Sequence, residues 1–384
     1  MDIPVQITAG TAGSLQLSAS FAQAVVDADQ GAPVSVASVS TTAVQVQSPG
    51  ALAIQIRAPQ LVEGFNATLT VEVSNTGGAE VSGLTLGALD VTNAAGAVVS
   101  HAPATLPPGP LAGGARASFT FDVVPPPGAG TLTVHVRVTG TETNTSAQRI
   151  GEVTSAPPFP VLRPGDLLAD LRGLPATASV GQALTLLVVV TNSGQTAVTG
   201  VMASLSQRGS PTDGSLTITG PAEPAQNLAA SASASFTFKA TVAAAGPVHL
   251  TASASGTLQG GGAAAVSPSS GDLIAQVPAQ LTATLTPDRT RVSIGQALRL
   301  TLLVQNTGAT DAVNVSAAAP ATASGTTAAI GAITPVAAGT VAVLRAGQSA
   351  SFIWSTSATS AGQAIFVSSA QGTDGNDATM KPST

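Results

Sequence analysis

LTVEVSNTG at residues 69–77 is the stretch that decides the fold, because the same pattern returns twice further along the chain. The later copies are LLVVVTNSG at 186–194 and LTLLVQNTG at 300–308, which lie 117 and then 114 residues later. Each Asn follows a glycine by eleven residues, the glycines being Gly64, Gly181 and Gly295. Recurrence at this interval indicates a tandem array of one domain type.

Each copy combines an alternating strand with a turn. Leu69, Val71 and Val73 alternate with Thr and Glu, which predicts a strand with one face on a core and the other toward solvent. The turns that follow contain Asn75 and Gly77, Asn192 and Gly194, and Asn306 and Gly308. Because Asn and Gly tolerate positive φ, we expect each turn to reverse the chain into a hairpin partner such as residues 81–86.

A pair of aromatic residues two positions apart also recurs. The pairs are Phe119 and Phe121, Phe236 and Phe238, and Phe352 and Trp354, in a chain with 9 Phe, 1 Trp and no Tyr. Residues at i and i+2 of a strand face the same way. We therefore predict that each pair fills a core, and does not form an exposed platform for sugars or bases.

The remaining apolar pattern contains further alternating strands and no helical period. About seven strands in each repeat of roughly 115 residues predict an all-β protein of tandem immunoglobulin-like antiparallel β-sandwich domains. The expected complete domains are 49–160, 161–276 and 277–384.

The order of these motifs resembles a known family. A strand, an Asn-Thr-Gly turn, a second strand, a Leu-x-x-Gly loop (111–114 and 344–347) and a Phe-x-Phe strand are similar to the bacterial cell-adhesion-related repeats known as CARDB. The resemblance implies immunoglobulin-like modules used as stalks, spacers and adhesive segments of surface and secreted proteins. The second repeat departs from it, with Ser231 where the loop glycine is expected.

The composition argues against several classes of function. Only 8% of residues are charged, and the 13 basic residues are scattered, so no cluster is present to neutralise nucleic-acid phosphates. There is no Cys, which excludes disulfides and thiolate metal sites. No apolar run approaches the roughly 20 residues of a spanning helix, so we expect no membrane-spanning segment.

We predict no catalytic residue, no metal site and no cofactor. The histidines, His101, His135 and His249, occupy unrelated repeat positions without a second ligand at metal spacing. Asp27, Asp29, Asp374 and Asp377 lie in Gly-containing turns but lack the further oxygen ligands that calcium requires. Lys239 beside the second aromatic pair is interpreted as a surface lysine, and not as an isopeptide crosslink.

Residues 1–48 are predicted to be the C-terminal part of an incomplete domain. Gly13 precedes Gly64 by 51 residues, as Gly130 precedes Gly181. This alignment places Leu15 and Leu17 in the closing strand, and Val5 and Ile7 at the position of the aromatic pair. Half a sandwich exposes an apolar face and open edges. We therefore expect residues 1–48 to complete a sandwich with strands from outside this segment, either of a neighbouring copy in a head-to-tail fibre or of the upstream part of a longer polypeptide. In the first case these four residues form an inter-chain strand region.

The sequence favours a non-enzymatic structural protein, either a segment of an extracellular fibre or of an adhesin stalk. The expected location is extracellular or at the cell surface. The expected partners are further copies in a head-to-tail filament, or other surface proteins. The alternative is a set of carbohydrate- or protein-binding accessory modules of a larger secreted enzyme or adhesin, which an exposed aromatic platform would reveal.

Overall fold

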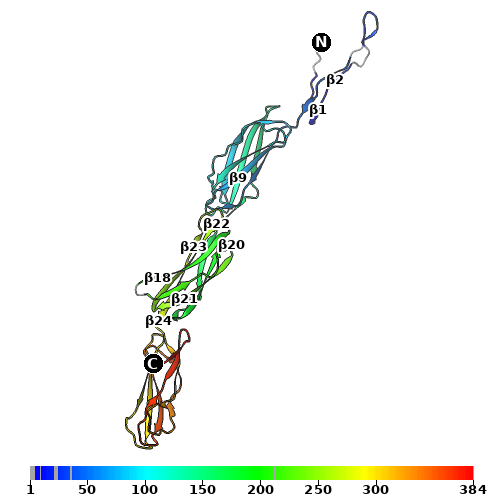
Figure 1. The fold of residues 1–384 in the computed structure, drawn as a ribbon. Coiled ribbons are helices and arrows are strands. Elements are labelled where there is room, and N and C mark those ends of the chain that lie inside the picture. Colours follow the sequence, from blue (N-terminus) through cyan, green and yellow to red (C-terminus); the bar gives the residue numbers. More distant parts are fainter. Residues whose placement is uncertain (1–4, 9, 21–24, 35–36, 211–212, 384) are drawn as a thin grey trace. The chain divides into compact units, whose positions relative to one another are not determined.

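The computed structural model describes residues 5–8, 10–20, 25–34, 37–210 and 213–383, and every regular element within these ranges is a β-strand or bridge (Figure 1). The fold is all-β, as predicted, and most strand pairs are antiparallel. The chain divides into two compact units, Met1–Pro164 and Gly165–Thr384.

The first unit contains a sandwich of two sheets, which we call the first domain. One sheet has the order β11–β9–β7, and the other has the order β10–β12–β14–β8 with β13 added on β12. The strands are β7 (Leu52–Arg57), β8 (Leu61–Val62), β9 (Ala67–Asn75), β10 (Val81–Asn93), β11 (Arg116–Val123), β12 (Thr131–Glu142), β13 (Gln148–Thr154) and β14 (Phe159–Leu162). Alternate residues of β9 and β12 are buried between the sheets, because side chains point to opposite faces along a strand.

The second unit begins with a sandwich of two five-stranded sheets, called here the second domain. Their orders are β19–β21–β17–β15–β23 and β16–β24–β22–β18–β20. The strands are β15 (Asp166–Arg172), β16 (Thr177–Ser179), β17 (Ala183–Asn192), β18 (Val198–Arg208), β19 (Ser215–Thr219), β20 (Gln226–Leu228), β21 (Ser233–Ala244), β22 (Gly246–Leu258), β23 (Ala265–Ser267) and β24 (Ser269–Gln276).

The same unit ends in a third domain built on the same plan. Its sheets have the orders β25–β26–β31–β29 and β30–β27–β33–β34, with a small extra sheet of β28 and β32. The strands are β25 (Leu281–Pro287), β26 (Ala297–Asn306), β27 (Ala312–Ala317), β28 (Ala321–Thr322), β29 (Thr334–Ala337), β30 (Val341–Leu344), β31 (Ser349–Ser357), β32 (Phe366–Val367), β33 (Ala370–Asp374) and β34 (Met380–Pro382).

The buried apolar residues form three clusters, one inside each sandwich. The alternating residues of the opening motif lie at their centres: Leu69, Val71 and Val73, then Leu186, Val188 and Val190, then Leu302 and Val304. Each sandwich therefore has its own core, which is what makes it a domain.

The Asn-x-Gly turns do not form the predicted hairpins. β9 and β10 lie in different sheets and are not paired, and the same holds for β17 with β18 and for β26 with β27. Each turn carries the chain across the sandwich from one sheet to the other. None of Gly77, Gly194 and Gly308 has a positive φ, so the expectation based on left-handed backbone was also wrong.

Two of these turns require glycine because the backbone of another segment passes directly against them. A Cβ atom on Gly77 would lie 1.9 Å from the carbonyl oxygen of Pro49, and one on Gly308 would lie 2.1 Å from that of Pro278. Both prolines belong to the segment that enters the domain. Only a residue without a side chain lets that segment cross the turn.

The first unit also contains a two-stranded ribbon before its sandwich, which Figure 1 draws in blue. Three short strand pairs form it, namely β1 (Gly13–Leu15) with β6 (Val44–Val46), β2 (Ser18–Ala19) with β5 (Val39–Ser40), and β3 (Val25–Val26) with β4 (Pro33–Val34). We call these six strands the N-terminal ribbon. Residues 1–4, 9, 21–24 and 35–36 of the predicted partial domain lie outside the described residues.

Candidate functional sites

The asparagine of each turn is buried and uses its whole amide group. The exposed fractions of Asn75, Asn192 and Asn306 are 1%, 0% and 0%. In the second domain, Asn192 Oδ1 accepts hydrogen bonds from the backbone N–H groups of Asp166 (3.2 Å) and Gly194 (3.1 Å). Its Nδ2 group donates to the carbonyl oxygens of Thr196 (2.8 Å) and Leu228 (3.2 Å).

The other two asparagines repeat this arrangement. Asn75 binds Ala51, Gly77, Ala79 and Leu111, and Asn306 binds Gln280, Gly308, Thr310 and Leu344. In each domain the amide therefore joins the entering segment, its own turn and the loop that begins at the Leu of the Leu-x-x-Gly motif. The residue type is explained by four backbone groups, buried or partly buried, that need partners, and not by turn conformation.

Ser231 keeps the loop conformation of the other two domains. Its φ is 61°, close to the 79° of Gly114 and the 76° of Gly347. Its N–H donates to the carbonyl oxygen of Asn192 at 2.9 Å, as the N–H groups of Gly114 and Gly347 donate to Asn75 and Asn306 at 2.8 Å. The departure from the motif thus changes no contact, but it places a serine in a left-handed conformation that costs free energy.

The aromatic pairs lie in β11, β21 and β31 and point into the three cores. The exposed fractions are 6% and 3% for Phe119 and Phe121, 0% and 2% for Phe236 and Phe238, and 1% and 2% for Phe352 and Trp354. Phe121 also meets the ring of His101 edge-on, with centroids 5.6 Å apart. Among the described residues, the exposed large hydrophobic side chains are Val, Leu and Ile and include no aromatic ring.

A cluster of polar side chains lies where the second and third domains meet within one unit. We call it the junction cluster: Ser179 and Gln276 of the second domain, with Thr310, Asp374 and Asn376 of the third. Asp374 is 1% exposed, and its carboxylate accepts hydrogen bonds from Ser179 Oγ at 2.8 Å and from the N–H of Ala279 at 2.7 Å. Asn376 Nδ2 donates to Gln276 Oε1 at 3.0 Å.

The carboxylate of Asp374 is ionised in this setting. Burial raises its pKa, but the hydrogen bonds from Ala279 N–H, Ser179 Oγ and the backbone N–H of Asn376 outweigh burial and hold the pKa below its usual value. From sequence alone, Asp374 is only one member of a turn that lacks the ligands for calcium. The buried protein donors now occupy its oxygens, and no group of three metal-ligating side chains occurs in the described part of the chain.

Glu142 of the first domain is the counterpart of Asp374 of the third domain. Glu142 pairs with Val81 at the start of β10, and Asp374 pairs with Ala312 at the start of β27. The Glu142 carboxylate binds Arg149 of its own domain, which lowers its pKa, and accepts a hydrogen bond from Gly50 N–H at 3.1 Å. The second domain has Leu258 at this position.

The three histidines lie apart and make separate contacts. His101 has its two ring nitrogens against the carbonyl oxygens of Leu89 and Ala102. His249 Nδ1 lies 2.7 Å from Asp272 Oδ1. His135 lies between the carboxylates of Glu152 (2.9 Å) and Asp90 (3.3 Å), whose hydrogen bonds raise its pKa.

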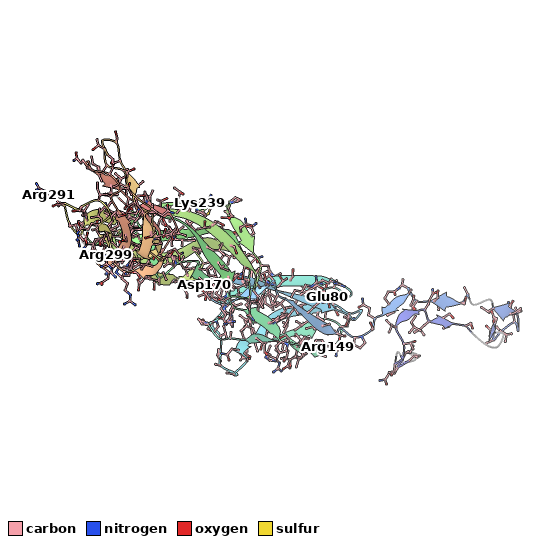
Figure 2. All side chains as sticks on the ribbon, turned by 90° about the horizontal axis from the view of Figure 1, so that it is seen from below. Glu80, Arg149, Asp170, Lys239, Arg291 and Arg299 are labelled. Carbon is pink, nitrogen blue, oxygen red and sulfur yellow. The ribbon has the colours of Figure 1, made fainter. Side chains whose placement is uncertain are left out.

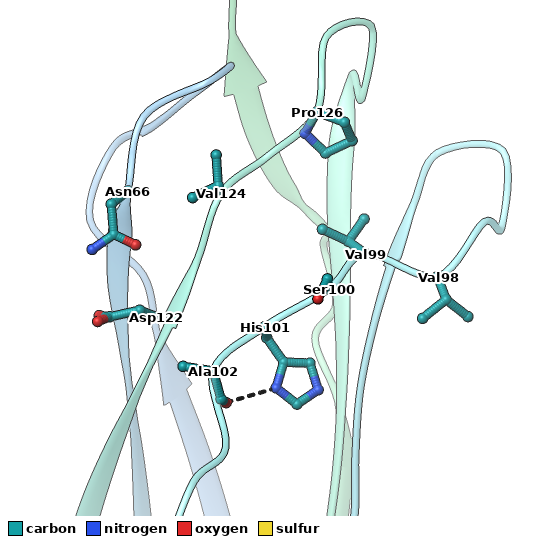
Figure 3. Close-up of a pocket in the computed structure, with 9 residues that line it drawn as sticks. All are labelled: Asn66, Val98, Val99, Ser100, His101, Ala102, Asp122, Val124 and Pro126. Carbon is teal, nitrogen blue, oxygen red and sulfur yellow. Dashed lines mark hydrogen bonds between the residues drawn. The ribbon is translucent and has the colours of Figure 1, made fainter.

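A depression of about 580 Å³ borders β11 in the first domain (Figure 3). His101 and Asp122 are its titratable side chains. Both are engaged within the protein, His101 with backbone carbonyls and Asp122 with Thr68 Oγ1 at 2.5 Å. No group there is positioned for catalysis.

Figure 2 labels six charged side chains of the sandwiches, including Lys239. Among the described residues, Glu142 and Asp374 are the buried charged ones. Lys239 is exposed in the middle of β21, directly after Phe238, as a surface lysine should be. Within the described ranges, no helix is present that could cross a bilayer.

The predicted inter-chain residues lie in or near the N-terminal ribbon. Leu15 ends β1, and Leu17 lies between β1 and β2 with 41% of its surface exposed. Val5 and Ile7 are 72% and 43% exposed and lie in no strand. A groove lined by Val5, Leu17, Ala19 and Val39 runs along this region.

No protein-family model matches the chain, and no curated protein matches it. Among solved structures, the Escherichia coli adhesin FdeC aligns at 15% identity over 88% of this chain and 98% of that chain, with a TM-score of 0.28. A red sea bream transglutaminase aligns at 14% identity over 58% and 31%, with a TM-score of 0.23. The E. coli alpha-2-macroglobulin aligns at 11% identity over 96% and 28%, with a TM-score of 0.20. At such TM-scores these likenesses carry no argument about function.

Proposed function

We propose that this chain is a non-enzymatic structural protein of the bacterial cell surface, a segment of an adhesin stalk or extracellular fibre built from CARDB-like repeats. The observation that carries the proposal is the bond between each entering segment and the turn asparagine. Asn75, Asn192 and Asn306 hold the N–H groups of Ala51, Asp166 and Gln280, respectively. Because each domain holds the segment that enters it by this hydrogen bond, such domains are suited to being joined one after another in a stalk or fibre.

The low charge and the separate cores agree with this role. Each domain buries its own aromatic pair, so each has a separate core within an array. The junction cluster adds a specific polar contact between two consecutive domains. A spacer gains from such contacts because they restrict how one repeat turns on the next.

Surface labelling of intact cells tests the proposal. Antibodies raised against residues 165–384 should label the native cells, and protease added outside should remove that label while a cytoplasmic marker stays intact. Electron microscopy of the shed material should show whether it is a filament or single molecules. Labelling that appears only after the cells are broken would overturn the surface role.

A further inference from the structure

The outer edge of the aromatic strand is covered by a neighbouring segment in the second and third domains. In the second domain β21 pairs with β19 over residues 239–244. The carbonyl of Thr237 accepts a hydrogen bond from Ala222 N–H at 3.1 Å, and the N–H of Thr237 donates to Glu223 Oε2 at 2.6 Å. In the third domain β29 pairs with residues 353–355 of β31. In both domains this edge is therefore occupied from within the same chain.

The corresponding edge of β11 in the first domain is open over most of its length. Another segment reaches it at one end, where the Asp122 carbonyl accepts a hydrogen bond from Ala102 N–H at 2.8 Å (Figure 3). The chain then leaves β11, since residues 106–110 line a depression with residues 82–84 of β10. Among the described residues, no segment pairs with the outer edge of β11 over residues 116–120.

Alternate residues of β11 direct their backbone groups toward this open edge. The carbonyl of Ala115, just before β11, bonds Asn75 N–H on the inner side, whereas the carbonyl of Asp122 bonds Ala102 on the outer side. Because backbone groups alternate along a strand, the odd-numbered residues bind β9 and the even-numbered residues point outward. In the described part of the chain, the residues whose outward N–H and C=O groups have no protein partner are Arg116, Ser118 and Thr120. Such an edge is a template for pairing with another strand.

The solvent face of β11 carries opposite charges at its two ends, Arg116 and Asp122. The Arg116 side chain is 67% exposed and binds Glu72 at 2.7 Å. Its guanidinium group has several N–H donors and can bind a second carboxylate. The Asp122 carboxylate accepts a hydrogen bond from Thr68 and has further acceptor capacity. Both charged groups can therefore take another partner.

We propose that the open edge of β11 pairs with the same edge of a second copy of this chain, antiparallel and about a twofold axis at Ser118. Ser118 then faces Ser118 of the second copy, and Arg116 faces Thr120 of the second copy. Each facing pair exchanges two backbone hydrogen bonds, so about six form between the chains. The contact uses the same surface on both copies, and it closes at a dimer.

Charge complementarity selects both the second copy and this register. Each Arg116 lies diagonal to Asp122 of the other copy, with Cα atoms about 7 to 8 Å apart, which is within reach of a long side chain. Moving the axis toward Asp122, to Phe119 or beyond, would place the second copy against the stretch that Ala102 already occupies. Moving the axis the other way would bring the two copies of Arg116 together. Because one strand carries both charges, a second copy supplies the complement at both ends.

Single-cysteine variants of the full chain test the register, since the chain contains no Cys. In Ser118→Cys the two Cα atoms would face each other at about 5.5 Å, a distance that a disulfide spans. Thr120→Cys is the matched control, because its two Cα atoms would lie about 13 Å apart along the strands. Mild oxidation should link Ser118→Cys into a covalent dimer and leave Thr120→Cys monomeric on a non-reducing gel. If Ser118→Cys stayed monomeric, or if Thr120→Cys linked as readily, the proposed pairing would be wrong.

Sedimentation of the full chain tests the dimer without a crosslink. The wild type should dimerise as its concentration rises. Arg116→Asp and Asp122→Arg should each weaken the dimer at least tenfold, because they place like charges across the contact. The double variant with both changes should recover the dimer, since opposite charges again meet at each end. Arg172→Asp removes an exposed arginine bound to Asp170 in the second domain and is the matched control, which should leave the dimer unchanged.

This contact goes beyond the proposed surface role and does not depend on it, so surface labelling and sedimentation can fail separately. A wild-type chain that stays monomeric would show that a second copy does not occupy the edge of β11. A dimer that survives both single charge reversals would place the contact elsewhere on the chain. A double variant that keeps its circular dichroism spectrum but remains monomeric would refute the register. Each of these three results would overturn the proposal.

Discussion

The second and third domains share one polar framework but differ in how much core surrounds it. Asn192 and Asn306 bind equivalent backbone groups at nearly equal distances. In the described residues, the second domain has 22 buried apolar residues in its cluster and the third has 10. The hydrogen-bonded turn is common to both domains, whereas the number of buried apolar residues differs and sets the free energy of unfolding of each domain.

Truncating the central aromatic residue should cause the largest loss of stability, and the outcome should differ between the two domains. Phe236→Ala and Phe352→Ala should each cost about 3 to 5 kcal/mol, because both side chains are fully buried. With its smaller core, the third domain should unfold outright, while the second only shifts its denaturant midpoint. Trp354 is the single Trp of the chain, so its fluorescence reports on the third domain alone.

The exposed Leu168 provides the control for this pair, and Leu168→Ala should change stability by less than about 0.5 kcal/mol. Phe352→Ala could instead leave unchanged both the fluorescence of Trp354 and the denaturant midpoint that it reports. That result would refute the claim that the smaller core leaves the third domain less stable.

Removing the turn asparagine should cost the two domains about the same. Asn192→Ala and Asn306→Ala each remove the side-chain partner of four backbone groups that are buried or partly buried, so we expect a loss of about 3 kcal/mol in either domain. Urea titrations followed by circular dichroism and Trp354 fluorescence measure both. Asn227, an exposed residue that binds only Gly200, is the matched control. A loss confined to one domain would show that the framework is not equivalent in the two copies.

Asp374→Asn should destabilise the third domain by about 1 to 3 kcal/mol, since hydrogen bonds to a charged group are stronger than neutral ones. The pKa of Asp374 is lowered by folding, so its contribution is fully present above the unfolded pKa and is lost as pH falls through the folded pKa. The difference in Tm between the wild type and Asp374→Asn should therefore be large at pH 7 and shrink below about pH 4.

Asp170, whose carboxylate is exposed beside Arg172, is the control for this experiment. Asp170→Asn should leave Tm nearly unchanged at every pH, as exposed ion pairs contribute little. A Tm difference for Asp374→Asn that did not vary with pH would show that the charge of the carboxylate is not what holds the junction.

The smallest effect should come from the loop residue that distinguishes the second domain. Ser231→Gly should stabilise that domain by about 0.5 to 1 kcal/mol, because glycine adopts a left-handed φ without steric cost. The reverse exchange, Gly347→Ser, should destabilise the third domain by a similar amount. Thermal melts of both variants test this, and an unchanged Tm in both would show that the loop tolerates a side chain freely.

The sequence was sufficient for the strands and their class because alternation and repeat spacing are local properties. It predicted the strands that contain Leu69 and Phe236. The Asn-x-Gly turns are predicted wrongly because the local preference of Asn and Gly for positive φ does not determine their conformation. The actual causes include the backbone groups of Asp166 and Leu228 around Asn192 and the carbonyl of Pro49 against Gly77. These are long-range contacts that spacing does not reveal.

The junction cluster was missed for a related reason. Ser179 and Asp374 are 195 residues apart, and neither lies in a motif shared by all repeats. One signal was present in the sequence: an acidic residue stands two positions after Gly140 and Gly372 but not after Gly256, where Leu258 is found. That pattern could have marked the first and third domains as binding their incoming chain through a carboxylate.

The crossing of Pro278 over Gly308 has a mechanical consequence. If the chain is pulled from its ends, tension that reaches the third domain along the backbone at Pro278 arrives next to the turn, where Gln280 is bonded to Asn306 and Thr307. The load is thus shared with the turn at the end of the β25–β26 pair, where Leu281 faces Asn306, before it can peel β25 away from β26. A residue larger than glycine at this crossing would move the point of attachment outward, and the domain would yield at a lower force.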